Sequence, residues 1–170
     1  NFDRHSNSYY QWRIAKIQPQ IDKGSKNPLL FDDLAVAYSK LGDDKKAIAL
    51  MEQKEKFAPN LYETFANLGT FYIHDGQFEE GLKYINKAIK INPDAHFGRE
   101  IYQKYLVEFI LSKKKKESES NNFYIFLIEK YNAKNNSKEK FLPEVENEKA
   151  IKGVLGMMRF GNYNSPILLN

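Results

Sequence analysis

The sequence predicts an all-α protein whose centre consists of two tandem helical hairpins. The first observation is a repeat of 34 residues, because identical residues recur at this one offset. The second is helical spacing of the recurring apolar residues, and the third is the presence of Gly and Pro where turns are needed. The recurring pairs are Phe31 with Phe65, Leu34 with Leu68, Tyr38 with Tyr72, Gly42 with Gly76, and Pro59 with Pro93.

Each predicted hairpin has a first helix with one buried stripe and a second helix with small residues on its inner face. Phe31, Leu34 and Tyr38 lie at i, i+3 and i+7, which places them on one side of a helix. Gly42 favours a turn after this helix, and Pro59 stops the second helix. The small and bulky second-helix residues are Ala47 and Met51 in the first unit, and Gly81, Ile85 and Ala88 in the second.

The N-terminal segment, residues 1–27, is expected to form a helix that caps the first hairpin. Tyr10, Ile14, Ile17 and Ile21 have helical spacing. Pro19 interrupts this pattern, so we expect the helix to stop or kink shortly after Ile17.

The repeat region is expected to span residues 28–111, with residues 95–111 as the first helix of an incomplete third unit. Arg99 stands there in the position of Phe31 and Phe65, so the regular pattern breaks. A polar, lysine-rich segment at residues 112–122 replaces the second helix and predicts a linker.

The C-terminal third, residues 123–170, is expected to form helices that pack on the repeats. Residues 123–131 are too short and apolar for periodicity to separate helix from strand, so context alone favours a helix. A longer helix is expected from Glu144 to Phe160, closed by Gly161, with Gly153 and Gly156 allowing close packing. Its apolar stripe is predicted to comprise Ala150, Ile151, Val154, Leu155 and Met158.

Residues 28–94 resemble the tetratricopeptide repeat, whose pattern is aromatic, Leu, small, Tyr on a first helix and small, bulky apolar, Pro on a second. Gly81 and Lys54 depart from that pattern, since Ala and a small residue are usual there. We therefore expect looser packing at these two positions. The resemblance implies a non-enzymatic scaffold that binds a protein or peptide, with no cofactor.

In such arrays the first helices line a concave groove, and the resemblance implies which residues face it here. These are Asp32, Asp33, Val36, Lys40, Glu63, Asn67, Thr70, His74, Phe97 and Glu100, followed by Lys104 and Glu108. Some family members clamp a peptide's C-terminal carboxylate with basic and amide residues. Only Asn67 matches that clamp, because Asp32, Val36, Phe97 and Ile101 occupy its other positions. The acidic groove therefore favours a basic or polar peptide.

The overall charge does not indicate a nucleic-acid partner. The net charge of +4 is carried by residues 112–140, which contain eight Lys and four Glu. Basic residues do not alternate with aromatic ones, as single-strand binding would require. No apolar run is long enough to span a membrane. The lack of cysteine is compatible with reducing and oxidising compartments, so none is assigned. The absent initial Met and the apolar final residues indicate part of a longer product.

Two alternatives remain open at this level. The chain's own C-terminal third, either residues 123–131 or 144–160, would fill the groove, and the hairpins would then serve as a spacer or as a homodimer surface in a larger protein. A metal-dependent enzyme at His96 and Glu100 is disfavoured, because two residues at i and i+4 lack further ligands. No Ser, His and acid order suggests a catalytic triad, so neither a catalytic nor a metal site is predicted.

Overall fold

A computed structural model describes residues 5–115, 120 and 122–160, and these residues form helices and no strands. This confirms the all-α prediction. The chain divides into two compact units, Asn1–Ile91 and Asn92–Asn170. Each unit is described by itself below.

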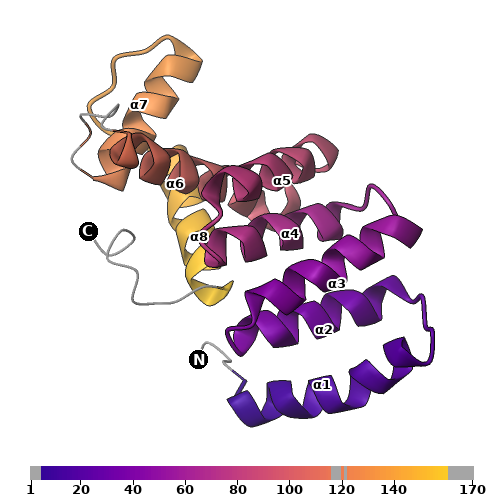
Figure 1. Cartoon of the computed structure of the whole chain (residues 1–170). Helices are drawn as coiled ribbons and strands as arrows, with labels where there is room; N and C mark the ends of the chain where they lie inside the picture. Colours follow the sequence, from indigo (N-terminus) through magenta and orange to yellow (C-terminus); the bar gives the residue numbers. More distant parts are fainter. Residues whose placement is uncertain (1–4, 116–119, 121, 161–170) are drawn as a thin grey trace. The chain divides into compact units, whose positions relative to one another are not determined.

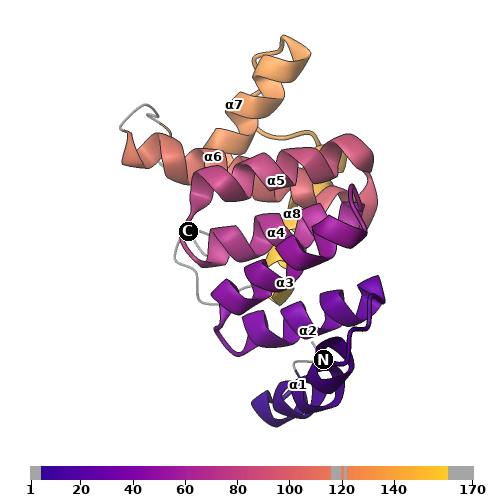
Figure 2. The same ribbon diagram turned by 45° about the vertical axis from the view of Figure 1, so that its right-hand side comes forward.

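Unit 1 contains five successive helices that lie side by side in chain order (Figures 1 and 2). They are α1 (Asn7–Asp22), α2 (Pro28–Lys40), α3 (Asp44–Phe57), α4 (Tyr62–His74) and α5 (Phe78–Ile91). The bounds of α2 and α3 recur 34 residues later in α4 and α5, as the repeat predicts. The turns between the paired helices use Gly42 and Gly76, whose φ angles of 87° and 80° favour glycine.

The repeated stripes form the core of unit 1. Phe31, Leu34 and Leu68 are at most 1% exposed and pack with Met51 between successive helices. Phe65 lies in a smaller cluster with Ala66 and Ala88. The core therefore includes the repeated Phe and Leu residues that the 34-residue period identifies, together with residues outside the repeat such as Ile17 and Ile21.

The expectation of looser packing at Gly81 was wrong. A Cβ atom added there would lie 2.6 Å from Cγ1 of Ile73 and 3.0 Å from the carbonyl oxygen of Gly69. At Gly69 a Cβ would lie 2.5 Å from Cδ1 of Ile85. The two glycines therefore permit a close approach of α4 and α5 that alanine would obstruct.

The N-terminal helix continues through Pro19, so the expected stop after Ile17 was wrong. α1 extends to Asp22 and ends with hydrogen bonds from the Lys23 and Gly24 amides to carbonyl oxygens of the last turn. Pro19 lies on the exposed side, where water can hydrate the carbonyl that loses its donor. Ile17 and Ile21 remain in the helix and join the core formed with α2.

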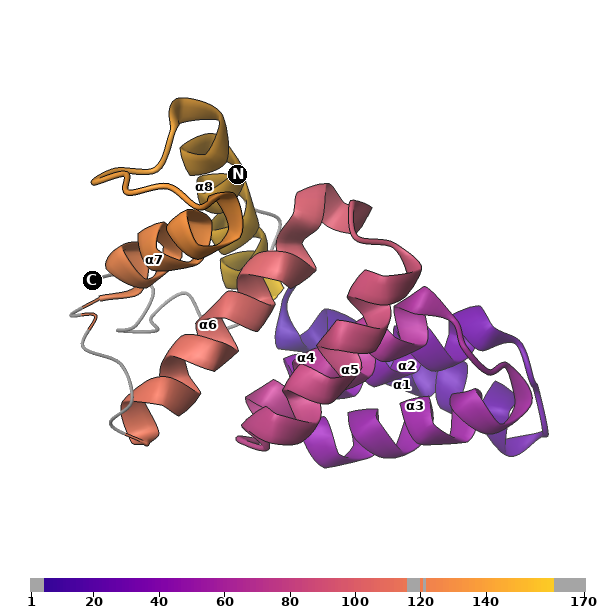
Figure 3. The same cartoon turned by 90° about the horizontal axis from the view of Figure 1, so that it is seen from above.

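Unit 2 contains a short 3-10 helix, η1 (Ala95–Gly98), followed by α6 (Arg99–Lys114), α7 (Phe123–Asn135) and α8 (Glu144–Phe160). α7 and α8 both pack against α6 (Figure 3). Their common core is aromatic and aliphatic. It contains Tyr102, Phe109, Phe123, Phe126, Leu127, Ile128, Leu142, Ala150 and Met157.

The buried side of α8 is rotated from the predicted stripe. Ala150 and Met157 are buried, whereas Ile151 and Leu155 are 51% and 46% exposed. The cause is the close crossing with α6, since a Cβ at Gly153 would collide with the ring of Tyr102. The glycine rather than the aliphatic residues thus sets the packed side of α8, as its role in close packing predicts.

Some expectations fall outside the described residues. Gly161 and the remaining residues to 170 are among them, as are residues 116–119 and 121 of the predicted linker.

Candidate functional site

Asp32, the first of the predicted groove residues, takes part in a polar network between α2, α3 and α4. Its two carboxylate oxygens lie 2.8 and 2.7 Å from Nζ of Lys54, and Nδ2 of Asn67 donates to Oδ1 at 3.1 Å. The Lys54 side chain is 1% exposed and that of Asp32 is 17% exposed. Burial raises the pKa of Asp32, although Lys54 and Asn67 oppose this effect. The network explains how a lysine replaces the usual small residue at position 54.

Asp33 is shared with the N-terminal helix. It forms an ion pair with Arg13 of α1, but 47% of its side chain stays exposed. α1 and α2 are also joined by a hydrogen bond from the Tyr38 hydroxyl to Oε1 of Gln18 at 3.0 Å. Val36, one turn further along α2, is partly buried against the main core. Asp33 therefore remains accessible, whereas Val36 contributes mainly to packing.

The C-terminal ends of the first helices bring together a serine, a histidine and an aspartate. Ser39 donates to Oδ1 of Asp44 at 2.6 Å, and Nδ1 of His74 lies 3.5 Å from the Ser39 hydroxyl and 3.6 Å from Asp44. In a catalytic triad the histidine would stand between the other two and use a different nitrogen for each. Here the serine hydroxyl bonds directly to the carboxylate. This cluster ties α2, α3 and α4 together and has no relay geometry.

Glu63 on α4 is exposed, and it has a counterpart that the sequence reasoning missed. Leu29 precedes Glu63 by 34 residues, so the two occupy the same position in successive first helices. Leu29 is 69% exposed. The repeat offset alone would have identified it. We call the matched positions the first-helix face, which consists of Leu29, Asp33, Val36 and Lys40 on α2 and Glu63, Asn67, Thr70 and His74 on α4.

Some side chains of the first-helix face already form hydrogen bonds within the protein. Thr70 donates to the Ala66 carbonyl at 2.9 Å, and Asn67 belongs to the Asp32 network. Lys40 is half-buried. The exposed groups of this face are therefore the aliphatic side chain of Leu29 and the carboxylates of Asp33 and Glu63.

Four of the predicted groove residues lie in unit 2, and two of these, Lys104 and Glu108 of α6, form an ion pair at 3.8 Å. Phe97 belongs to η1, and its side chain is outside what the structure describes. Glu100 is buried, and its Oε1 accepts from Nη2 of Arg99 at 2.6 Å and lies 3.2 Å from Nδ1 of His96. Burial opposes ionisation of Glu100, but the Arg99 guanidinium and His96 outweigh it, so the pKa of Glu100 is lowered. Glu100 acts here as an internal ion-pair partner.

The described residues hold neither a cluster of metal ligands nor a membrane-spanning helix. Across residues 5–115, 120 and 122–160, no three His, Asp or Glu side chains gather as potential metal ligands. Within the same ranges, every helix is too short or too polar to cross a bilayer.

Comparisons with known proteins agree with the repeat. The family model of the tetratricopeptide repeat matches residues 62–95, which cover α4 and α5. The small glutamine-rich tetratricopeptide repeat-containing protein 2 of Mycosarcoma maydis is 24% identical over 84 residues. This similarity spans 49% of the present chain and 24% of the relative, so the chain matches about a quarter of that protein's length.

Proposed function

We propose that this chain, which matches the tetratricopeptide repeat at residues 62–95, is a protein-interaction scaffold whose first-helix face binds a basic partner segment with an apolar side chain. The observation that carries the proposal is the combination of exposed Leu29 with the carboxylates of Asp33 and Glu63. An aliphatic side chain gains by contact with an apolar residue, and the carboxylates complement lysine or arginine. No catalytic step is proposed.

The ion pairs within the protein determine which carboxylates of the predicted groove can contact a partner. Asp32 is neutralised by Lys54 and takes little part in recognition. Glu63 is exposed and appears in no ion pair of the described residues, so its charge is fully available to a partner. Recognition should therefore depend on Glu63 and Leu29 more than on the buried members of the predicted groove.

Selection from a library of random peptides tests the proposal. The enriched peptides should carry Lys or Arg next to an apolar residue, and Glu63→Lys or Leu29→Gln should weaken binding at least about tenfold, or about 1.4 kcal/mol. Glu79→Lys is the matched control, because Glu79 is an exposed acidic residue on the second helix α5. Enrichment of acidic peptides, or equal losses with Glu79→Lys, would refute the assignment.

A homodimer is a second candidate, favoured by the exposed tryptophan of α1. Trp12 is 55% exposed and lies 6.0 Å from Tyr9 between ring centres. If α1 pairs with a second copy, the molar mass measured by light scattering should rise from the monomer value to the dimer value as the protein concentration increases. Trp12→Ser should keep the mass at the monomer value. A monomeric mass at every concentration would remove this candidate.

A further inference from the structure

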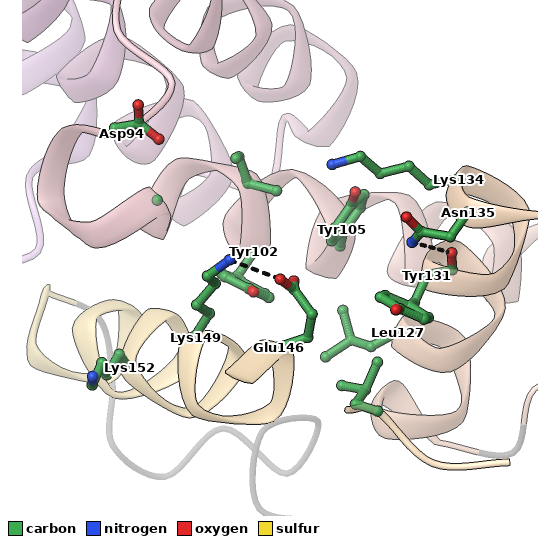
Figure 4. Close-up of a pocket in the computed structure, with 13 residues that line it drawn as sticks. Asp94, Tyr102, Tyr105, Leu127, Tyr131, Lys134, Asn135, Glu146, Lys149 and Lys152 are labelled. Atoms are coloured by element: carbon green, nitrogen blue, oxygen red, sulfur yellow. Dashed lines mark hydrogen bonds and ion pairs between the residues drawn. The ribbon is translucent and has the colours of Figure 1, made fainter. Parts of the chain in front are cut away.

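Unit 2 contains a cavity of about 610 Å³ between α6, α7 and α8, shown in Figure 4. Cavities of roughly 300 to 1,000 Å³ are typical of small-molecule sites. No residue of the first-helix face lines this cavity, so it is separate from the proposed protein-binding function. Its lining is part apolar and part charged. The residues are Asp94, Gly98, Ile101, Tyr102, Tyr105, Leu127, Tyr131, Lys134, Asn135, Leu142, Glu146, Lys149 and Lys152.

The apolar part of the lining comes from α6, α7 and the segment before α8. Ile101 comes from α6, Leu127 from α7 and Leu142 from the segment before α8. Leu127 and Leu142 are 6% and 9% exposed, so they belong to the core as well as to the cavity wall. Together with the tyrosine rings they offer a surface for a short aliphatic or aromatic group.

Tyr102 presents an unused hydrogen-bond donor to the cavity. Its side chain is largely buried, at 9% exposure, yet its hydroxyl makes no hydrogen bond within the part of the chain that the structure describes. Burial and the carboxylate of Glu146 raise the pKa of Tyr102 to about 12. The hydroxyl is therefore protonated at neutral pH and can donate to an acceptor. The hydroxyl is not fully buried, so a ligand in the cavity can accept this hydrogen bond.

The charges around the cavity favour an anion. Three lysines line the cavity with two carboxylates, those of Asp94 and Glu146. Lys152 is paired with Glu148, whose Oε2 lies 3.7 Å from its Nζ. Glu146 is already neutralised, because its Oε1 lies 2.7 Å from Nζ of Lys149. Lys134 forms no ion pair among the residues described, so its ammonium charge is available to a ligand.

We propose that this cavity binds a small acid, with a carboxylate or phosphate head group and a short apolar body. The head group would accept hydrogen bonds from the Tyr102 hydroxyl and from the ammonium group of Lys134. The apolar body would lie against Ile101, Leu127 and Leu142. A cationic ligand with the same body is opposed by the charge of Lys134, and a neutral one gains only the apolar contact.

Titration calorimetry of the full chain with four compounds that share an eight-carbon tail tests the proposal. Octanoate and octyl phosphate should bind, 1-octanol should bind at least about tenfold more weakly, and octylamine more weakly still. Resonances of the Tyr102 and Tyr105 rings should shift on addition of octanoate. Octylamine binding as tightly as octanoate, or none of the four binding, would overturn the proposal.

Two variants separate this site from non-specific association. Tyr102→Phe keeps the buried ring and removes the hydroxyl, and Lys134→Gln changes an exposed side chain outside the core of unit 2. Each should weaken octanoate about threefold to tenfold. Lys138→Gln is the matched control, since Lys138 is exposed and does not line the cavity. Unchanged affinity in Lys134→Gln, with intact helicity, would refute the site even if Tyr102→Phe were unstable.

Discussion

Replacing Lys54 with Met tests whether the ion pair with Asp32 is needed for the stability of unit 1. The lysine side chain is 1% exposed, and both carboxylate oxygens of Asp32 lie within 2.8 Å of its nitrogen. Methionine fills a similar volume but leaves the Asp32 carboxylate without its counter-ion. The expected result is a marked loss of unfolding free energy.

The structure sets the size of this loss. Removing one member of a buried ion pair costs roughly 3 to 5 kcal/mol, because the other charge stays buried. Asp32 keeps the hydrogen bond from Asn67 and is 17% exposed, so we expect the lower end, about 3 kcal/mol. The double variant Lys54→Met with Asp32→Leu removes both charges and should lie within about 1 kcal/mol of the wild type.

Urea unfolding followed by circular dichroism and by Trp12 fluorescence measures these energies, and Trp12, the single tryptophan, reports on unit 1. The two single variants and the double variant form a cycle, with an expected coupling energy of about 2 kcal/mol or more. A loss below about 1 kcal/mol in Lys54→Met, or strictly additive effects, would refute the reasoning.

Three further predictions concern packing and pH. Phe65→Ala should destabilise unit 1 by roughly 3 to 5 kcal/mol in the same urea assay, and a loss below about 1 kcal/mol would contradict the repeat register. Gly81→Ala should cost about 1 to 3 kcal/mol by overpacking against Ile73, despite the higher helix propensity of alanine, and an unchanged melting temperature would show that Ile73 can move away. The pKa of Glu100 is lowered below its ordinary value of 4.5, so its ionised form stabilises unit 2 above that pH, and this contribution is lost as the pH falls through the folded-state pKa. Thermal melts at several pH values between 5 and 2 should show a shallower decline for Glu100→Gln than for the wild type, whereas parallel curves would contradict the assignment.

The hairpins could be predicted from the sequence because their core residues repeat. Phe31, Leu34 and their counterparts are buried between successive helices in both hairpins. A fixed offset in the sequence therefore reveals the positions of the helices and of the turns. The offset also identifies Leu29, which belongs to the same position as Glu63.

Contacts between residues far apart in the sequence could not be predicted. Lys54 lies 22 residues from Asp32, and no local pattern indicates that a lysine in a small-residue position will be neutralised. Gly81 was expected to loosen the packing because its missing side chain was considered without its neighbour, whereas the backbone of α4 occupies that space. The buried side of α8 likewise depends on the Tyr102 ring, which only the fold brings against Gly153.

The Asp32 network also shows why a list of groove residues overstates a binding site. Family resemblance assigns side chains to a face, but hydrogen bonds decide which of them remain available. Asp32 and Asn67 form a hydrogen bond with each other, whereas the side chains of Glu63 and Leu29 are exposed to solvent. The candidate site is therefore smaller than the sequence indicates, and it is more apolar.

The most direct test of the proposed interaction face is a map of backbone amide shifts on addition of a selected basic peptide. Binding at the first-helix face predicts that the perturbed amides cluster on α2 and α4, around Leu29, Asp33 and Glu63, and that Glu63→Lys abolishes them. Perturbations concentrated on α3 and α5, or in unit 2, would contradict the proposed function.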